Sequence, residues 1–410
     1  MKVTICGGAG EHGRACFLIE SNHYRILLDC GMKKGEDRLP KLDRQIIPKI
    51  DAVFISHIHE DHSAGIPMLY QYGFTGDVWA SRSTIQFLGN KLNPDRYENK
   101  HFRSLEDDAA PGNWTELFQG LHILWGRSCH APGAVWMILR IDGKTIIYTG
   151  DYTPFSPLWQ HQPMESLIAS NILYDLALIE AAHDRGPQSW FKSVRNFINV
   201  IKTGLRQKGS LLLPVPQYGR GQDILLILLM FFDNCPILIS EEIYQVLEYS
   251  LQNPELLSLK GKARIEWIVK QPNLKVFGSQ RRLDFKNSGK IILVPGSMLD
   301  SDLAKQVFET MSSDWRNTLI FTGQLEPGSF GYSVFNQRDE DRKIQTVHCK
   351  LKIHQDIGDV HPLIQKIRPR KTILVHAEQN ETERMVRILN EADDCPVYSL
   401  KVGESITIGD

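Results

Sequence analysis

The feature that most constrains this chain is a cluster of metal-binding side chains in residues 56–65, directly after the apolar run 52–55. Four of them fall within six residues: His57, His59, Asp61 and His62. Such a cluster is unsuited to a hydrophobic core, because buried histidines and carboxylates need partners, and a divalent cation satisfies several at once. His57 and His59 share one side of an extended segment, whereas Asp61 and His62 follow at the turn. The stretch predicts a metal site with room for two neighbouring ions; a solvated polar loop is the alternative.

Composition narrows the class of protein. The 410 residues are 42% hydrophobic and 23% charged, which is typical of a soluble globular protein. This length predicts two domains, or one domain with a large insertion. The formal net charge of −1 argues neither for nor against a nucleic-acid partner.

The cysteines and the apolar runs bear on the compartment. The seven cysteines are odd in number and form no C-x-x-C pair, which favours a reducing compartment and argues against a thiolate zinc site. The N-terminus has no signal-peptide core, and the longest apolar run, residues 224–232, is too short to span a bilayer. We therefore expect a cytoplasmic protein without a membrane partner.

The pattern of elements divides the chain into three segments. Up to residue 182, short apolar stretches between turns predict strands with few helices, and Asp142-Gly143 predicts a tight hairpin. From 183 to 342 helical and strand patterns alternate, which predicts a parallel sheet between helices. From 343 the first pattern returns, with a strand to residue 353. We predict one domain made of residues 1–182 and 343–410, with a second domain inserted as residues 183–342.

Carboxylates and histidines recur at or just after the ends of the predicted strands. The positions are Asp29, the cluster at 57–62, His130, Asp151, Glu180, His354 and His376. One such position would be unremarkable in a chain of this length. Their repetition predicts that these side chains form a single rim around one site.

The motifs at these positions resemble those of the metallo-β-lactamase fold. The resemblance rests on His57-x-His59-x-Asp61-His62 together with Leu28-Asp29-Cys30-Gly31, His130-Ala-Pro-Gly133 and Thr149-Gly-Asp151. The opening Gly7-Gly-Ala-Gly-Glu-His-Gly-Arg14 resembles the branch that processes nucleic acids, the β-CASP nucleases. Segments 215–223, 295–299 and 322–331 resemble further motifs of that branch, in order and over essentially the full length. The resemblance implies an α/β protein: a metallo-β-lactamase αββα sandwich with an inserted β-CASP α/β domain.

The same resemblance implies a ligand set for two divalent ions. A set of histidines and carboxylates without a thiolate suits zinc or manganese. We expect zinc, with manganese as the alternative. One ion would be held by His57, His59 and His130, the other by Asp61, His62 and His376, and Asp151 would bridge them. Asp29 matches a family aspartate that orients ligand histidines without touching the metal. Two ions in such a site can share a hydroxide, which supplies a nucleophile at neutral pH.

The candidates for catalysis are Asp61, His354 and Glu180. Glu180 lies at the family's motif A and His354 at its motif B. Imidazole suits a general acid or transition-state stabiliser, and Glu180 would hold its far nitrogen. Each also has an ordinary interpretation, a satisfied core histidine for His354 and a surface salt bridge for Glu180.

Two further residues are candidates for binding a phosphate of the substrate, Arg220 and Ser297. An arginine in a glycine-flanked turn combines backbone N–H groups with a bidentate donor. The alternative is that Gly219 and Arg220 only cap the helix that follows.

The histidine at motif C, His376, is the residue that accompanies RNA-directed members of the family. We therefore predict a ribonuclease that cuts within the chain or from the 5′ end, with RNA as partner and single-stranded DNA as the alternative. The sequence departs from the family pattern at three places: after Glu180, around His354, and at Tyr332. These departures alter the surface against which the nucleic acid would lie, and they leave the metal positions intact. A DNA nuclease, a hydrolase of another phosphodiester or small ester, and a weakly catalytic scaffold are the rival functions. A homodimer or an accessory protein is left open.

Overall fold

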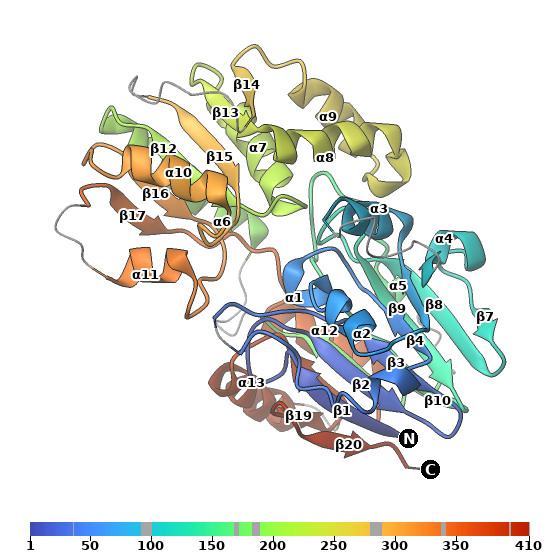
Figure 1. Cartoon of the computed structure of the whole chain (residues 1–410). Coiled ribbons are helices and arrows are strands. Elements are labelled where there is room, and N and C mark those ends of the chain that lie inside the picture. Colours follow the sequence, from blue (N-terminus) through green and yellow to red (C-terminus); the bar gives the residue numbers. More distant parts are fainter. Residues whose placement is uncertain are drawn as a thin grey trace.

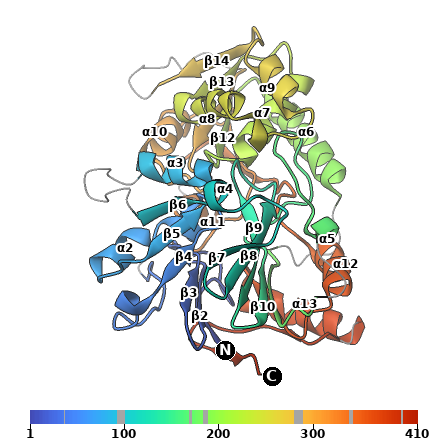
Figure 2. The same cartoon turned by 90° about the vertical axis from the view of Figure 1, so that its right-hand side faces the viewer.

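The computed structural model of the chain has two parts (Figures 1 and 2). The lower part is a sandwich that holds both ends of the chain, and the upper part is formed by the middle of the chain. The structure describes residues 1–35, 37–91, 101–167, 172–182, 189–278, 289–337, 342–392 and 395–409. The catalytic candidates come mainly from the sandwich. The middle of the chain supplies one wall of a cleft that lies over these residues.

The first sheet of the sandwich has seven strands in the order β20-β1-β2-β3-β4-β5-β6. β1, β2 and β3 form an antiparallel meander, and β3 to β6 are parallel. Parallel pairing brings the carboxyl ends of β3 and β4 to the same edge, where Asp29 and the 57–62 cluster follow. The bounds are β1 Lys2–Gly7, β2 Cys16–Glu20, β3 Arg25–Leu28, β4 Ala52–Phe54, β5 Asp77–Ala80, β6 Phe102–Ser104 and β20 Ser405–Thr407.

The second sheet also has seven strands, in the order β19-β18-β11-β10-β9-β8-β7. β9 and β10 join through Asp142-Gly143, and both residues have positive φ, 49° and 77°. The hairpin expected from the sequence is confirmed, since this turn needs positive φ at both central residues. The bounds are β7 Thr115–Phe118, β8 Leu121–Arg127, β9 Val135–Ile141, β10 Lys144–Tyr148, β11 Leu176–Glu180, β18 Thr372–Val375 and β19 Val397–Tyr398.

Apolar side chains of the two sheets meet in one core, which includes Phe17, Phe54, Trp125 and Tyr148. Helices cover the outer faces: α2 and α3 pack on the first sheet, and α5, α12 and α13 on the second. The αββα layering predicted from the sequence is confirmed. The helices of this part are α1 Glu60–Ser63, α2 Ile66–Gln71, α3 Arg82–Lys91, α4 Leu105–Asp108, α5 Met164–Leu167, α12 Ile357–Ile367 and α13 Gln379–Ala392, with a 3-10 turn at Ile47–Lys49.

The inserted part is built on a six-stranded parallel sheet in the order β14-β13-β15-β12-β16-β17, as the alternating pattern predicted. One face packs on α6 to α9 and the other on α10 and α11. Its strands are β12 Leu211–Val215, β13 Ile237–Ser240, β14 Leu274–Phe277, β15 Ile291–Pro295, β16 Thr318–Phe321 and β17 Gln345–His348. Its helices are α6 Trp190–Arg206, α7 Arg220–Phe231, α8 Glu241–Gln252, α9 Gly261–Ile268, α10 Asp302–Met311 and α11 Phe330–Asn336, with a 3-10 turn at Pro254–Leu256.

The domain limits drawn from the sequence stay a prediction, but one strand pairing bears on them. A limit at residue 343 places the next strand in the sandwich. In the structure that strand, β17, ends at His348 and pairs in parallel with β16 of the inserted sheet. Its half-buried, mixed composition gave no indication of which sheet it would join. The second limit therefore belongs after His348.

No two cysteines of the described residues are joined by a disulfide. Across the described ranges, the structure contains no helix with the length and apolar character needed to cross a membrane.

Candidate metal centre

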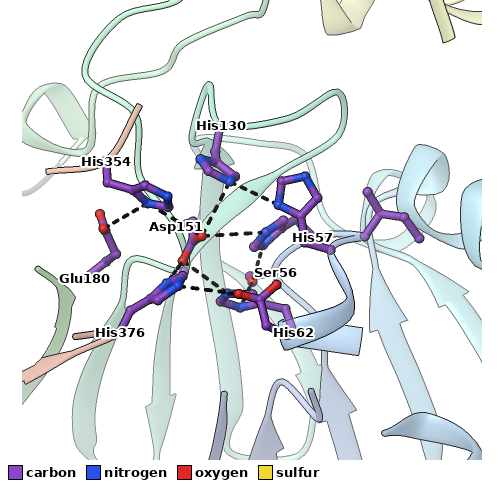
Figure 3. A network of polar contacts seen from close by, with 12 residues as sticks. Ser56, His57, His62, His130, Asp151, Glu180, His354 and His376 are labelled. Carbon is purple, nitrogen blue, oxygen red and sulfur yellow. Dashed lines mark hydrogen bonds and ion pairs between the residues drawn. The ribbon is translucent and has the colours of Figure 1, made fainter. Parts of the chain in front are cut away.

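The rim predicted from the sequence assembles at one edge of the sandwich (Figure 3). Glu180 ends β11 and Asp151 follows β10, and these two neighbouring strands run parallel. His376 follows β18, which pairs in parallel with β11 on its other side. Because parallel strands end at the same edge, three side chains from distant parts of the chain converge there.

The first group of candidate ligands contains His57, His59, His130 and Asp151. Each offers one ligand atom, and these atoms lie within 4.8 Å of one another. The Nδ1 atom of His57 lies 3.0 Å from Ser56 Oγ, which leaves Nε2 to face the group. That Nε2 atom is buried and has no hydrogen-bond partner. A buried ring nitrogen in this position fits a cation, which would satisfy it.

The second group contains Asp61, His62 and His376, again with ligand atoms within 4.8 Å of one another. Asp151 lies between the groups. Its Oδ1 atom is 3.1 Å from His62 Nε2 and 2.5 Å from His376 Nδ1. Its Oδ2 atom is 3.4 Å from His130 Nε2 and 3.9 Å from His57 Nε2. The two oxygens of one carboxylate therefore face the two groups, which is the arrangement of a bridging ligand.

The protonation of the centre follows from burial and mutual charge. Burial lowers the pKa of His57 well below its usual value, and it lowers the pKa of His130 to about 3. Both rings therefore present a neutral nitrogen, the form that binds metal. Burial alone would raise the pKa of Asp151, but His376 and His62 outweigh it and hold that pKa well below the usual range. The side chain that lies between the two groups is therefore a carboxylate anion.

Asp29 holds the centre from beneath. Its carboxylate accepts hydrogen bonds from Ser56 N at 2.6 Å, from Ser56 Oγ at 2.7 Å and from the Tyr148 hydroxyl, and its Oδ2 lies 2.7 Å from His62 Nδ1. It has a positive φ of 56°, unusual outside glycine. The contact at Nδ1 leaves Nε2 of His62 to face Asp151, so Asp29 orients a candidate ligand and is not itself in either group.

The segment after Asp29 packs directly on the ligand helix. A β-carbon added at Gly31 would lie 1.7 Å from the carbonyl oxygen of Asp61, so no other residue fits without moving α1. Cys30 N also donates a 2.9 Å hydrogen bond to the His62 carbonyl. The Asp29-Cys30-Gly31 motif thus fixes the backbone that carries two candidate ligands.

His354 and Glu180 lie next to each other, to the left of Asp151 in Figure 3. His354 Nδ1 is 3.0 Å from Glu180 Oε1 and 3.7 Å from Asp151 Oδ2. Burial, followed by the charge of Asp151, raises the pKa of Glu180 to about 8, although it accepts backbone hydrogen bonds from Ala182 and Gln355. Asp151, His354 and His376 also form a group with metal-binding spacing, so His354 has two candidate roles, proton donor and ligand.

Several residues that shape the centre were not identified from the sequence. The carbonyl of Tyr218, in the inserted domain, lies 3.0 Å from His59 Nε2, which leaves Nδ1 of His59 to face His130 at 3.2 Å. Thr153 Oγ1 lies 3.1 Å from His130 Nδ1 and donates to the Ile353 carbonyl. A backbone carbonyl cannot be identified from the sequence, because every residue has one. Thr153 could have been suggested by its position, two residues after Asp151.

A cleft of about 620 Å³ lies over the centre and is lined by both parts of the chain. Arg220 and Ser297, the predicted phosphate-binding residues, line it together with Asp61, Asp151 and His354. Arg220 is 7% exposed, its guanidinium packs against Gly323, and its Nε atom has no hydrogen-bond partner. Burial lowers the pKa of Arg220 to about 10, so it remains charged at neutral pH. Arg220 is therefore a buried cation that faces the cleft and forms no ion pair with any residue that the structure describes.

One lysine ties the two walls of the cleft together. Lys34 of the sandwich lies 2.6 Å from Asp300 Oδ2 of the inserted domain and 2.9 Å from Glu60 Oε2 beside the candidate ligands. The two domains are therefore held across the cleft by charge as well as by apolar contact.

Two family models match the chain. Residues 9–202 match the Metallo-beta-lactamase superfamily, and residues 221–334 match the Beta-Casp domain. These ranges contain the predicted site residues except Arg220, His354 and His376.

Individual relatives are distant but similar over most of the chain. Transcription termination factor FttA of Lokiarchaeum sp. (strain GC14_75) is 26% identical over 93% of this chain and 67% of its own length. Probable RNase MJ4 of Methanocaldococcus jannaschii is 27% identical over 92% of this chain and 94% of its own length. Cleavage and polyadenylation specificity factor subunit 3 of Dictyostelium discoideum is 25% identical, and the match spans 54% of that protein. A crystal structure of a protein of unknown function from Enterococcus faecalis V583 matches 99% of both chains with a TM-score of 0.60 and 16% identity, which shows the fold alone.

Proposed function

Because the chain belongs to the β-CASP family of metallo-β-lactamase-fold nucleases, which are metal-dependent hydrolases, we propose that it is a ribonuclease that hydrolyses RNA phosphodiester bonds with two divalent ions. The observation that carries the proposal is the position of Asp151. Its two oxygens face two separate ligand groups at the base of a cleft shared by both domains. Relatives named as an RNase and as a cleavage and polyadenylation factor support RNA as the substrate.

The donor set fits divalent cations, since it consists of imidazoles and carboxylates with buried nitrogens that lack hydrogen-bond partners. We assign one ion to His57, His59 and His130, the other to Asp61, His62 and His376, and the bridge to Asp151. A set of imidazoles and carboxylates without a thiolate suits zinc or manganese. Zinc is the proposed metal and manganese the alternative. When bound, the two ions would supply a hydroxide nucleophile at neutral pH and offset charge on the phosphoryl oxygens.

The residues of the chain supply the remaining steps. Glu180 lies at Nδ1 of His354, so the other ring nitrogen, Nε2, is the one left to serve the substrate. A proton donated from His354 Nε2 would neutralise the leaving oxygen of the cleaved phosphodiester. Buried Glu180 fixes the orientation of the His354 ring through its contact with Nδ1.

Arg220 and Ser297 are the proposed substrate contacts. The guanidinium of Arg220 is buried without an anionic partner, and a phosphate of the RNA would supply one. Ser297 lines the cleft beside it and offers a hydroxyl donor. The second domain over the centre favours a polymeric substrate, since it provides contacts beyond the reacting phosphate.

The first test measures bound metal and RNA cleavage on the same preparation. Purified protein is expected to carry about two ions per chain. It should cleave an end-labelled RNA of mixed sequence with Zn²⁺ or Mn²⁺. Asp61→Ala should lose one ion and most of the activity, whereas Glu266→Ala, an exposed carboxylate on α9, should lose neither. An Asp61→Ala protein that cleaves RNA at the wild-type rate would contradict the two-ion scheme. If RNA stays intact while a lactone, a cyclic nucleotide or single-stranded DNA is hydrolysed, that compound would replace RNA as the proposed substrate.

A second test separates the two candidate roles of His354. His354→Ala should slow cleavage by about 10²- to 10⁴-fold, the usual range for a lost general acid, and should keep both ions. His23→Ala, an exposed histidine far from the centre in sequence, is the matched control. Loss of an ion in His354→Ala would instead assign His354 as a ligand in the group with Asp151 and His376.

A further inference from the structure

The exposed face of α6 (Trp190–Arg206) is strongly basic, and the proposed mechanism makes no use of it. The helix contains four cationic side chains and no carboxylate. All four are exposed, and in the ranges that the structure describes none of them forms an ion pair or a side-chain hydrogen bond. They are Lys192, Arg195, Lys202 and Arg206. In a chain of net charge −1, this is a local concentration of positive charge.

The spacing of these side chains makes a continuous stripe. Phe191, Arg195, Lys202 and Arg206 follow one another at intervals of four, seven and four residues, which places them on one side of a helix. The opposite side, with Phe197 and Ile201, is buried against the inserted sheet. At 1.5 Å per residue the stripe is roughly 25 Å long.

The first turn of α6 adds aromatic surface to the stripe. Trp190 and Phe191 lie with ring centroids 5.3 Å apart, and Phe155 of the sandwich lies 4.9 Å from Trp190 and 6.4 Å from Phe191. Phe191 is 72% exposed and Phe155 is 44% exposed. Large aromatic side chains left in water at one spot are typical of a binding surface.

Short contacts connect this turn to the catalytic residues. Ser193 Oγ donates to the Trp190 carbonyl at 2.7 Å and accepts a hydrogen bond from Lys352 N at 3.3 Å. Lys352 is two residues before His354. On the sandwich side, Thr153 contacts His130 Nδ1 and the Ile353 carbonyl, and Phe155 follows two residues later. Figure 2 shows α6 on the right-hand side of the inserted part, above α5 and α12. The aromatic end of the stripe is therefore attached to the segment that carries His354.

We propose that the exposed face of α6 binds single-stranded RNA outside the scissile bond, with bases stacked on Phe191 and its neighbours and with phosphates on the four cations. This inference rests on the proposed ribonuclease function. Exposed rings beside cations that form no ion pair within the described part of the chain match the two recognition elements of single-stranded nucleic acid, base stacking and backbone charge. An acidic protein would use the cations and leave the rings without a partner. An anionic membrane would favour an apolar stripe along the helix, and here the stripe is cationic.

The direct test is the salt dependence of RNA binding. The probe is a fluorescent single-stranded RNA of about 24 nucleotides, and anisotropy is measured in EDTA so that nothing is cleaved. Changing all four cations of α6 to Gln should weaken binding by about 10- to 100-fold. Because each phosphate contact on single strands contributes about 0.7 to the slope of log K against log salt, the slope should fall by about 2 to 3.

The matched control removes the same charge elsewhere. Four exposed cations outside α6 are changed to Gln in one protein: Lys2, Lys49, Lys275 and Lys366. This protein should bind the RNA with the wild-type affinity and slope. An equal loss in both quadruple variants would overturn the proposal, since binding would then follow net charge alone.

Stacking is tested separately at Phe191. Phe191→Ala should weaken binding by about tenfold, within the usual range for a lost base–aromatic stack, and Phe191→Trp should restore it. Because Phe191 is largely exposed, the unfolding temperature should not change. Loss of affinity in both variants would overturn stacking as its role.

Cleavage assays distinguish failure of this inference from failure of the proposed function. A tetranucleotide, too short to reach from the centre along α6, should be cleaved by the quadruple α6 variant at the wild-type rate. The long RNA should show a raised KM and an unchanged kcat. If the wild type cleaves RNA and the α6 variant binds the long RNA with wild-type affinity, the inference fails and the ribonuclease stands. If the variant instead loses only binding to phosphatidylserine vesicles or to polyglutamate, those partners replace RNA. A wild type that cleaves no RNA would overturn the ribonuclease proposal.

Discussion

The sandwich and the inserted domain both bury charged side chains beside the cleft, but they compensate that charge differently. In the sandwich, Asp29 and Asp151 are surrounded by histidines, hydroxyls and backbone N–H groups at 2.5 to 3.1 Å. In the inserted domain, α7 begins with Arg220 and carries Asp223 three residues later, both buried. The two do not pair, and Asp223 instead accepts a hydrogen bond from Ser156 Oγ at 2.9 Å.

The difference indicates what each wall of the cleft is missing. The ligand groups of the sandwich need only cations to be complete, and their carboxylates are held ionised for that purpose. Arg220 lacks an anion, and desolvating an unpaired charge costs stability in the free protein. This contrast is what the proposed function requires: a resident metal held by the sandwich and a substrate phosphate bound at the inserted wall. Each of the following substitutions removes a buried charged or ionisable side chain from one of the two domains.

The largest effect is expected at Asp151, because both ligand groups depend on it. Asp151→Ala should lower the RNA cleavage rate by about 10⁴-fold or more and reduce bound metal below two ions per chain. Mass spectrometry of metals and a cleavage time course measure both. Full metal content with normal cleavage would remove Asp151 from the bridge. Asp302→Ala, which changes an exposed carboxylate at the start of α10, serves as the control.

A smaller effect is expected at Arg220, where substitution should weaken RNA binding and stabilise the folded protein. Arg220→Met should raise KM for RNA by about 100-fold, since a charge-assisted contact to phosphate is lost. The same change should raise the free energy of unfolding by about 1–3 kcal/mol, because an unpaired buried charge is removed. Arg316→Met, at an exposed arginine paired with Asp314, should change neither. A destabilised Arg220→Met protein with normal KM would show that Arg220 only holds the fold.

The smallest effect is expected at Asp223 and depends on pH. Burial raises the pKa of Asp223 to about 8 in the folded protein, above its ordinary 3.8, so the folded state holds a proton that the unfolded state has lost. Stability from this group is therefore complete below pH 4 and declines as the pH rises toward 8. Asp223→Asn should raise the free energy of unfolding by about 2 kcal/mol at pH 8 and leave it nearly unchanged at pH 4. Denaturant titrations at both pH values give the comparison; an equal effect at the two values would show that Asp223 is ionised throughout.

The same contrast explains how much could be predicted from the sequence. The sandwich residues were recognisable because each lies at a strand end and the strands are set by local apolar pattern. The Asp142-Gly143 hairpin was predictable for the same reason. Convergence of His130, Asp151 and His376 then follows from strands that end at one edge of a sheet.

What the sequence did not reveal are relations between distant segments. The carbonyl of Tyr218 orients His59, and every residue type has a carbonyl. β17 joins the inserted sheet because its partner β16 presents a free edge there. The four residues of β17 do not indicate which sheet offers that edge. The missing partner of Arg220 is likewise a property of the folded cleft, since only the structure shows which anions are absent around it.

The place of β18 in the chain also fixes when the enzyme can first act. His376 is made only after the whole inserted domain, which takes on the order of ten seconds or more at ordinary rates of protein synthesis. During that interval the ribosome presents a sandwich that lacks β18 beside β11 and one ligand of its second group. On the proposed ligand assignment, the growing chain should therefore cleave no RNA until His376 has been made. A chain truncated anywhere in the inserted domain should remain inactive, although every other ligand has already been made.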